Sequence, residues 1–303
     1  MQSRRRFLRN ALASVGAASL GVGAYTWRVE PHWLEITRQR LPVLGLPAGL
    51  KGCTLAQLSD IHVGPRVDDD YVVNTLQRVA ALKPDFVVHT GDWITYRGPQ
   101  QFDQLRRVLE HMPHGRLGTL GILGNHDYGF NWQMVEVAEK VTSIAKNAGV
   151  HILRNEAVSI GGLQFIGLDD FWSPAFHPTL VLARHGEAPS SIVLCHNPDV
   201  ADQPVWGGYQ GWILAGHTHG GQCKPPFLPP PLLPVTNRRY TAGMVLVEGK
   251  RILYISRGVG HLLRVRFNVR PEVPVFRLER APQLDPPREI GFLRPASQQC
   301  QLS

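Results

Sequence analysis

The sequence predicts an α/β protein with mostly parallel strands in its first half. Apolar runs of strand length alternate there with segments whose apolar residues recur at helical spacing. Short clusters of Asp, His and Asn follow the ends of these runs, which is where open α/β sheets place their functional sites. With 303 residues and 43% apolar content, the chain can bury a sizeable core, so we expect one large domain with appendages.

Three strands are expected in the first half, at residues 54–58, 86–89 and 117–123. A helix should follow the first strand, because Asp68-Asp69-Asp70 offers an N-cap and first-turn acids and Lys83-Pro84 ends the helical periodicity. The apolar residues that recur at helical spacing in it are Val72, Leu76, Val79 and Ala80.

Two more helices should follow the second and third strands. The third helix is expected over about residues 131–147, with Gly149 as its C-terminal cap. The inward residues of these helices are expected to be Phe102, Leu105, Val108 and Leu109 in the second and Met134, Ala138, Val141 and Ala145 in the third.

The strand–helix alternation does not continue into the second half. Short strands separated by turns replace it, and little helix is expected there. This pattern predicts a second, more mixed sheet packed against the first. The strands are expected near residues 150–154, 163–168, 191–195, 211–215, 242–247 and 251–256.

The N-terminal residues 1–29 resemble a twin-arginine export signal. Four arginines (Arg4, Arg5, Arg6 and Arg9) precede an Ala/Gly-rich apolar run over residues 11–25. The run is shorter than the roughly 20 apolar residues of a spanning helix. We therefore expect the twin-arginine export machinery as a partner and a location on the periplasmic or outer face of the inner membrane. An uncleaved membrane anchor and a basic tail before a surface helix are the alternatives.

Three further segments complete the predicted domain organisation. Residues 30–51 are rich in Pro and Gly and extended in character, so they are expected to form a connector. The main domain should span residues 52–278. Residues 279–303 are Pro-rich and aperiodic, which predicts a disordered tail.

The net charge of +8 permits an anionic partner without requiring one. No aromatic-interleaved nucleic-acid module is visible, so nucleic acid is not expected as a partner. The nearest approach to a basic patch is Arg257, Arg264, Arg266 and Arg270, for which we expect a solvated surface. The four cysteines form no CxxC pair, which argues against a structural disulfide and against a zinc–thiolate site.

Five polar clusters carry the chemistry. They are Asp60-Ile61-His62, Gly91-Asp92, Gly124-Asn125-His126-Asp127, Cys195-His196-Asn197 and Gly216-His217-Thr218-His219. In Asp-x-His and His-x-His, an extended backbone turns both side chains toward one side. One such motif is weak evidence for a metal site, whereas five at strand ends are strong evidence.

These clusters, read as SDIH, GDWI, GNHD, CHNPD and GHTHGG, resemble the motifs of calcineurin-like metallophosphoesterases in that family's order. The likeness covers roughly residues 52–268. It implies a four-layer α/β/β/α sandwich of two mixed sheets, with a dinuclear metal site between them at the strand ends.

The resemblance also implies the ligands of two divalent ions. The first ion would be bound by Asp60, His62, Asp92 and His219, and the second by Asp92, Asn125, His196 and His217. Asp92 would thus be shared between ions roughly 3.5–4 Å apart. Carboxylate and amide oxygens mixed with imidazoles suit Mn²⁺, Fe or Zn²⁺ and do not by themselves select among these ions. We expect Mn²⁺, with Fe or Zn²⁺ as alternatives.

By the same resemblance, a hydroxide bridging the two ions attacks phosphorus in line. His126 would stabilise charge or protonate the leaving group, and Asp127 would orient the His126 ring by a hydrogen bond. A turn-capping role is the alternative for Asp127. Thr95 stands where the family often has Asp or Arg. His89 is expected to be a packed histidine and not a ligand.

The leader and the motif GHTHGGQ resemble a membrane-associated phosphodiesterase branch, whose relatives include enzymes that cleave UDP-2,3-diacylglucosamine in lipid A biosynthesis. Residues 224–235 (KPPFLPPPLLPV) should project, because proline forbids regular structure. This loop would seat acyl chains or touch a bilayer, or else would be a buried connection. Phe171, Trp172 and Phe176 would line the same pocket or pack in the core.

The favoured function is hydrolysis of a phosphodiester or pyrophosphate bond in a small-molecule, lipid-linked or nucleotide–lipid substrate. Two alternatives are a phosphomonoesterase or protein phosphatase with the same metals, and a non-catalytic, membrane-tethered metal-binding module. His126 argues against the last alternative, since a binding site has no use for a group aimed at a leaving group.

Overall fold

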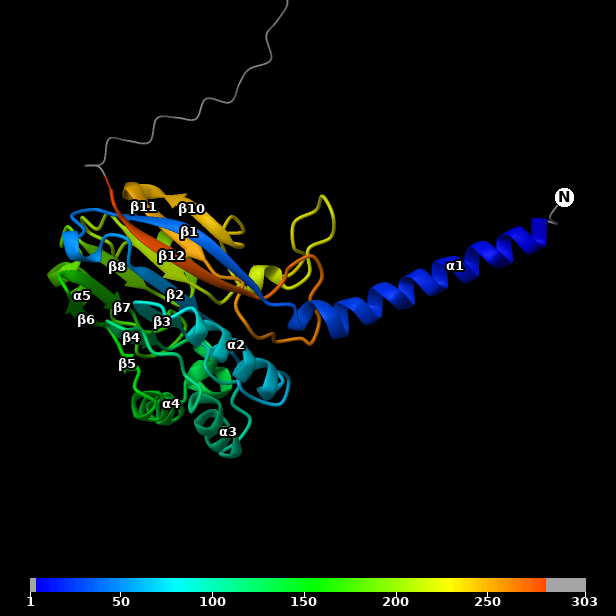
Figure 1. Ribbon diagram of the computed structural model, residues 1–303, viewed down its shortest axis with the longest axis horizontal. Coiled ribbons are helices and arrows are strands. Elements are labelled where there is room, and N and C mark those ends of the chain that lie inside the picture. Colours follow the sequence, from blue (N-terminus) through cyan, green and yellow to red (C-terminus); the bar gives the residue numbers. More distant parts are fainter. Residues whose placement is uncertain (1–3, 282–303) are drawn as a thin grey trace, which may run out of the picture.

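Two six-stranded sheets form the centre of the molecule in the computed structural model, which describes residues 4–281 (Figure 1). In spatial order, the first sheet contains β1 (Glu35–Val43), β12 (Glu272–Arg280), β2 (Thr54–Leu58), β3 (Phe86–Thr90), β4 (Gly118–Ile122) and β5 (His151–Ile152). The second contains β10 (Gly243–Val247), β11 (Arg251–Ile255), β9 (Trp212–Ala215), β8 (Ser191–Leu194), β7 (Leu163–Gly167) and β6 (Glu156–Ile160). Both sheets mix parallel and antiparallel pairs.

The predicted four-layer sandwich is confirmed by three apolar clusters that separate the layers. One cluster lies between the sheets, where residues such as Phe86 of β3 face Phe165 of β7. A second lies between the first sheet and the helices α2 (Asp69–Ala81), α3 (Gln100–Leu109) and α4 (Val135–Asn147). The third covers the outer face of the second sheet, together with α5 (Thr179–His185).

The first half matches its predicted order, with β2, β3 and β4 all parallel. The strand expected near residues 150–154 joins this first sheet as β5, in parallel with β4, so its predicted place in the second sheet is wrong. Asp68 caps α2 as expected, because its side chain accepts a hydrogen bond from the backbone N–H of Asp70. The third helix begins at Val135 and not near residue 131. Asn131 and Trp132 have positive φ angles, which interrupt the helix before that point.

Several elements were not expected from the sequence. The predicted connector over residues 30–51 is wrong in its central part, because β1 pairs in parallel with β12 along its whole length. The main domain therefore extends on both sides of residues 52–278. Pro42 in β1 and Pro274 in β12 weaken the strand signal. The strand β6 and the helix α5 were also missed. The predicted disordered tail lies outside the described residues, apart from residues 279–281.

The helix α1 (Arg4–Ala24) extends away from the body of the molecule (Figure 1). None of its residues is buried. Within residues 4–281, no helix combines the length and the apolar character that crossing a membrane requires.

Glu272 connects the two sheets at the start of β12. Its buried carboxylate accepts hydrogen bonds from the hydroxyl groups of Thr37 and Tyr254, both at 2.7 Å, and from the Arg257 guanidinium at 3.0 Å. Burial opposes ionisation, but Arg257 and the two hydroxyl groups lower the pKa of Glu272 below its ordinary value. The ionised form is therefore favoured in the folded state.

We predict that Glu272→Gln lowers the free energy of unfolding at pH 7 by about 2–3 kcal/mol, because a buried ion pair loses one partner. A carboxyl group with a lowered folded-state pKa stabilises the protein above its unfolded-state pKa and loses this effect as the pH falls. The difference between wild type and variant should therefore shrink below about pH 4.5. Denaturant unfolding across this pH range measures it, and a pH-independent difference would contradict the assignment.

Candidate metal centre

The candidate ligands lie in loops that follow the C-terminal ends of five strands. Asp60 and His62 follow β2, Asp92 follows β3, Asn125 follows β4, His196 follows β8, and His217 and His219 follow β9. All seven side chains are buried. The parallel strands of both sheets bring these loops to one edge of the sandwich. Residues separated by more than 150 positions in the sequence thus come into contact.

Five of these residues hold the backbone in the left-handed region. The φ angles are 55° for Asp60, 47° for His62, 58° for Asp92, 71° for His217 and 50° for His219. Side chains with a Cβ adopt this conformation at a cost of about 1–3 kcal/mol each, and such strain concentrates at functional sites. These left-handed residues lie in the loops after β2, β3 and β9, where the side chains enter the space between the loops.

The first cluster consists of Asp60, His62 and His219, whose potential ligand atoms all lie within 4.8 Å of one another. The Nε2 atoms of His62 and His219 are 3.0 Å apart, and Nε2 of His219 is 3.4 Å from Oδ1 of Asp60. Two imidazole nitrogens and a carboxylate that converge in this way can hold a divalent cation.

The second cluster consists of Asp92, His196 and His217, again within 4.8 Å. Nε2 of His196 lies 3.1 Å from Oδ2 of Asp92 and 3.2 Å from Nδ1 of His217. The same Oδ2 atom is 3.4 Å from Nε2 of His62 in the first cluster. The Asp92 carboxylate therefore lies between the two clusters, as a ligand shared by two ions would.

Asn125 provides an independent test of whether these residues fit metal ions. Its side-chain oxygen is buried and has no hydrogen-bond partner among residues 4–281. The neighbouring backbone N–H of His126 donates to Oδ1 of Asp92 at 2.9 Å, which places Asn125 beside the shared carboxylate. A buried amide oxygen without a donor is costly, and a cation would satisfy it. Together with the two clusters, this atom indicates a dinuclear metal site.

The outward ring nitrogens of three histidines are held by oxygen atoms. Nδ1 of His196 contacts the Thr90 carbonyl at 2.7 Å, and Nε2 of His217 contacts the Pro234 carbonyl at 2.9 Å. A carbonyl accepts, so each of these nitrogens carries the proton and the opposite nitrogen keeps its lone pair for the site. Nδ1 of His62 lies 3.0 Å from the hydroxyl group of Thr95. Thr95 thus supports a candidate ligand through a contact that the sequence did not reveal.

Glycine is required where two loops approach the carboxylates most closely. A Cβ atom on Gly124 would collide with the carboxylate and backbone of Asp92. A Cβ atom on Gly216 would collide with Ser59 and with the carboxylate of Asp60. The glycines of GNHD and GHTHGG therefore leave room for the carboxylates of Asp92 and Asp60, respectively.

The buried carboxylates and imidazoles of the site shift one another's pKa values. Burial opposes the ionisation of Asp92, but His196, His126 and His62 hold its pKa well below the ordinary value. Burial likewise disfavours the charged form of His196, yet the Asp92 carboxylate raises the pKa of His196 to about 10. Burial lowers the pKa of His217 to about 3 and keeps the pKa of His62 well below its usual range. Neutral imidazoles with free lone pairs are the form that binds metal.

Asp127 does not have its expected partner. Its carboxylate accepts hydrogen bonds from the backbone N–H groups of Gly124, Asp92, Trp93 and Ile94, at 2.8–3.2 Å. All four donors belong to the two loops that carry Asp92 and Asn125. The prediction that Asp127 orients the His126 ring is therefore wrong, and its loop-capping alternative fits the contacts. Asp127 fixes the backbone that presents the shared carboxylate.

His126 differs from the candidate ligands in being partly exposed. Its ring packs edge-on against that of His62, with centroids 5.0 Å apart. Burial lowers the pKa of His126 from its ordinary value, while Asp92 opposes this shift. The imidazole thus lies at the accessible side of the first cluster, where a substrate can reach it.

Two aromatic residues near the site have different surroundings. His89 stacks on Trp93 with ring centroids 3.6 Å apart, so it is packed as expected. Trp172 contacts His217 edge-on at 4.6 Å and forms part of the wall of the site. Phe171 and Phe176 instead pack against the outer cluster of the second sheet.

Arg266 is fully buried, so the predicted solvated surface is wrong for this residue. Its guanidinium donates to the carbonyl groups of Arg257, Gly258 and Gly260 and lies 3.4 Å from Nδ1 of His219. Burial lowers the pKa of Arg266 to about 10, so it remains a cation at neutral pH. Its neighbours gave no signal of this burial, because Val265 is exposed and Phe267 is only partly buried. Arg266 braces the glycine-containing loop that packs on Asp60.

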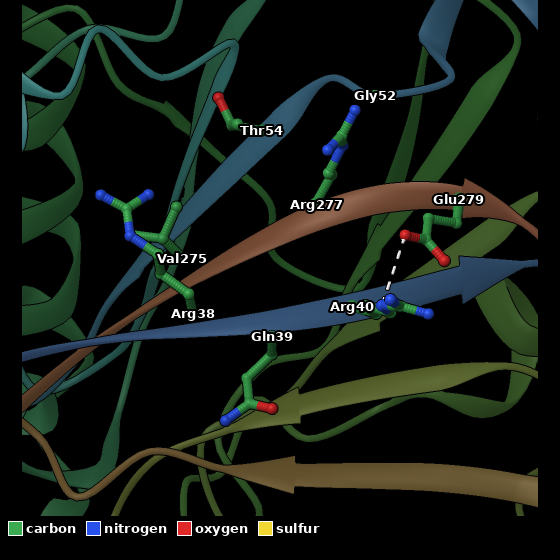
Figure 2. Close-up of a pocket in the computed structure, with 8 residues that line it drawn as sticks. All are labelled: Arg38, Gln39, Arg40, Gly52, Thr54, Val275, Arg277 and Glu279. Carbon is green, nitrogen blue, oxygen red and sulfur yellow. Dashed lines mark ion pairs between the residues drawn. The ribbon is translucent and has the colours of Figure 1, made fainter.

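A separate hollow of about 600 Å³ lies on the outer face of β1, β12 and β2 (Figure 2). Arg38, Arg40 and Arg277 surround it, and Arg40 pairs with Glu279 at 3.7 Å. Its wall includes Thr54 at the start of β2, whereas the candidate ligands follow the end of that strand. The hollow contains none of the candidate ligands.

The described cysteines are free. Cys53 and Cys195 are buried in the apolar clusters, and Cys223 is partly buried. Cys300 lies outside the described residues. None of the described cysteines belongs to either candidate metal cluster.

The sandwich and its paired histidine–carboxylate clusters define a dinuclear metallohydrolase. Residues 53–221 match the calcineurin-like phosphoesterase family. The chain is 32% identical to an uncharacterized metallophosphoesterase, YkuE, of Bacillus subtilis, covering 91% of this chain and 98% of the relative. It is also 32% identical to the phosphodiesterase YaeI of Escherichia coli, with 92% and 100% covered. The UDP-2,3-diacylglucosamine pyrophosphatase LpxG of Chlamydia muridarum is 26% identical, with 88% and 96% covered.

The chain therefore belongs to the calcineurin-like phosphoesterase family. It is a metal-dependent hydrolase of phosphoric esters, and the resemblance found in its motifs is confirmed.

We predict that Thr95→Val weakens metal binding about 10- to 100-fold, because the ring of His62 loses the hydroxyl group that orients it. Titration with Mn²⁺ against a chelating dye measures the affinity without reference to turnover. Thr142→Val is the matched control, since its buried hydroxyl group lies in α4 and has no partner among the described residues. Equal affinities in both variants would exclude a positioning role for Thr95.

Proposed function

We propose that this protein hydrolyses a phosphodiester or pyrophosphate bond in a lipid-linked or nucleotide–lipid substrate, at the outer face of the inner membrane. The observation that carries the proposal is an apolar cavity that borders the candidate metal centre. LpxG and YaeI, whose names describe a lipid-nucleotide pyrophosphatase and a phosphodiesterase, support the same reading.

The cavity has a volume of about 390 Å³ and shares His219 and Thr218 with the metal centre. Its other walls come from the Pro-rich loop and from the segment after β11, and they are almost entirely apolar. They include Leu232, Leu233, Leu262, Leu263 and Val265. A phosphate at the metal centre would leave an attached acyl chain directed into this space, where burial of each CH₂ group stabilises binding by about 0.8 kcal/mol.

The Pro-rich loop is joined to the metal centre by a hydrogen bond, because the Pro234 carbonyl accepts from Nε2 of His217. Asp199 also accepts from the backbone N–H groups of Thr236 and Asn237 at the end of the loop. The loop is thus held at both the second cluster and the β8 side of the site. The arrangement favours a substrate-binding wall over a mere connection.

The two ions would be held by the residue sets that the motifs imply. Asp60, His62 and His219 would bind the first ion, Asn125, His196 and His217 the second, and Asp92 both. When bound, such ions act as Lewis acids on the phosphoryl oxygens and lower the pKa of bound water. The mixed oxygen and imidazole donors suit Mn²⁺, Fe or Zn²⁺, and of these we propose Mn²⁺.

His126 would act on the substrate from the accessible side of the first cluster. Its ring contacts that of His62, and burial lowers the pKa of His126 while the Asp92 carboxylate opposes this shift. A neutral imidazole there can donate a hydrogen bond to a non-bridging oxygen, and a protonated one can donate its proton to the leaving oxygen. This role distinguishes an enzyme from a non-catalytic metal-binding module.

Export by the twin-arginine route would place the enzyme at the membrane surface. The arginines Arg4, Arg5, Arg6 and Arg9 begin α1, which extends away from the folded body and is joined to it by the segment after Ala24. Export in the folded state suits a protein whose ligands come from five loops, since the metals can be loaded first.

We predict that substitutions of Asp92 and His126 both lower activity but differ in their effect on metal content. Asp92→Asn should remove both metal and activity, because the shared carboxylate loses its charge. His126→Ala should keep two metal ions per chain and lower turnover on the order of 10²- to 10⁴-fold. Elemental analysis and hydrolysis of bis-p-nitrophenyl phosphate measure the two quantities. Loss of metal in His126→Ala would show that it is a ligand.

The substrate class is tested with soluble and lipid substrates on the same Mn²⁺-loaded protein. A phosphodiesterase should prefer bis-p-nitrophenyl phosphate to p-nitrophenyl phosphate, whereas a phosphomonoesterase should show the reverse. Leu233→Gln should lower hydrolysis of a diacyl nucleotide pyrophosphate about tenfold, because it makes the cavity wall polar. It should leave the soluble diester unaffected. Activity on soluble esters alone, with none on lipid pyrophosphates or diesters, would refute the lipid assignment.

A further inference from the structure

We propose that one end of the molecule is a docking face for an anionic lipid bilayer. This docking face consists of the exposed apolar side chains Trp27, Val29, Trp33, Phe227, Leu228, Leu232, Leu263 and Val265. The inference rests on the proposed lipid substrate, and it specifies which surface of this chain meets the membrane.

Apolar exposure at this end is large. Phe227 is completely exposed, Leu232 is 71% exposed and Leu228 59%. Leu263, on the neighbouring loop, is 57% exposed. Soluble proteins rarely gather large apolar side chains on one contiguous surface unless it contacts another molecule or a membrane.

Hydrogen bonds hold the three segments of the docking face together. The backbone N–H of Lys224 donates to the Phe267 carbonyl, and the Gln222 side chain donates to the carbonyl groups of Leu263 and Val265. The backbone N–H of Arg266 donates to the Thr26 carbonyl at the base of α1. Figure 1 shows the Pro-rich loop, the loop after β11 and the base of α1 at the same end of the molecule.

The charges of these segments favour anionic lipid. Residues 25–34, 222–235 and 257–270 contain six arginines and lysines and one acidic residue, Glu30. Glu30 is only 1% exposed and accepts a hydrogen bond from the backbone N–H of Val269. The exposed cations are Arg28, Lys224 and Arg264. A membrane surface rich in anionic headgroups attracts each such cation by about 1 kcal/mol.

The base of α1 carries two tryptophans, each with an arginine beside its ring. The Arg28 guanidinium lies 4.3 Å from the Trp27 ring, and the Arg270 guanidinium lies 4.2 Å from the Trp33 ring. Tryptophan prefers the headgroup region, and an arginine beside it can contact lipid phosphate. The Pro-rich loop would then insert Phe227 and Leu228 among the acyl chains, since proline keeps it rigid.

The docking face also adjoins the substrate cavity. Leu232, Leu263 and Val265 belong both to the face and to the cavity wall that reaches His219. An acyl chain can therefore pass from the bilayer into the cavity along a continuous apolar surface. Its phosphate would be carried to the metal centre without exposing the chain to water.

The test uses the full chain, loaded with Mn²⁺, and vesicles of phosphatidylcholine with or without phosphatidylglycerol. The double variant Phe227→Asp with Leu228→Asp should partition at least about tenfold less onto the anionic vesicles, because two apolar anchors become charged. The matched control is Leu180→Asp with Met244→Asp, which adds the same charge at residues that are 82% and 68% exposed on α5 and β10. The control should bind as wild type does.

The outcomes separate the docking face from the proposed function. Both double variants should hydrolyse bis-p-nitrophenyl phosphate at the wild-type rate, which shows that they are folded. Undiminished vesicle binding by the loop variant would overturn the docking face, and so would equal binding of wild type to neutral and anionic vesicles. If the loop variant loses vesicle binding and the wild-type protein is inactive on every lipid substrate, the docking face stands and the lipid substrate is refuted.

A second variant gives an independent readout. Phe227→Trp should add fluorescence that brominated lipids quench on anionic vesicles, beyond the quenching seen in wild type. The absence of any added quenching would place the loop outside the bilayer and overturn the proposal.

Discussion

The structure depends on a buried set of imidazole nitrogens and carboxylate oxygens whose lone pairs face one another. Nitrogen atoms of His62 and His219 lie 3.0 Å apart, and one oxygen of Asp92 lies within 3.4 Å of two histidines. Such groups repel unless a positive charge lies between them. Divalent ions supply this charge in a dinuclear phosphoesterase.

The surrounding fold maintains this costly arrangement by fixing the backbone. Five of the seven candidate ligands have positive φ angles. Asp127 binds four backbone N–H groups in the loops that present Asp92 and Asn125, and Thr95 holds the ring of His62. Apolar clusters on both faces of the sheets keep the strand ends in register. The strain at the site is therefore balanced by packing elsewhere, as expected for a preorganised centre.

The segment that follows α1 supports the candidate site. Thr26 accepts a hydrogen bond from the backbone N–H of Arg266, and Glu30 binds the backbone N–H of Val269. Arg266 in turn braces the loop that packs on Asp60 and approaches His219. The residues just after α1 thus stabilise the same loops that form the first metal cluster. The apolar cavity and the docking face lie on this side of the molecule.

The sequence by itself determined the alternation of strands and helices in the first half, the family and the residues that gather at the site. Those features are local: periodicity, capping and short motifs at strand ends. It did not determine β1 and β12, whose polar and proline residues weaken the strand signal until the two strands pair across more than 200 positions. Nor did it determine the partners of Asp127 and Thr95 or the burial of Arg266. Only the tertiary structure decided these, because each depends on which distant loop supplies the opposite atom.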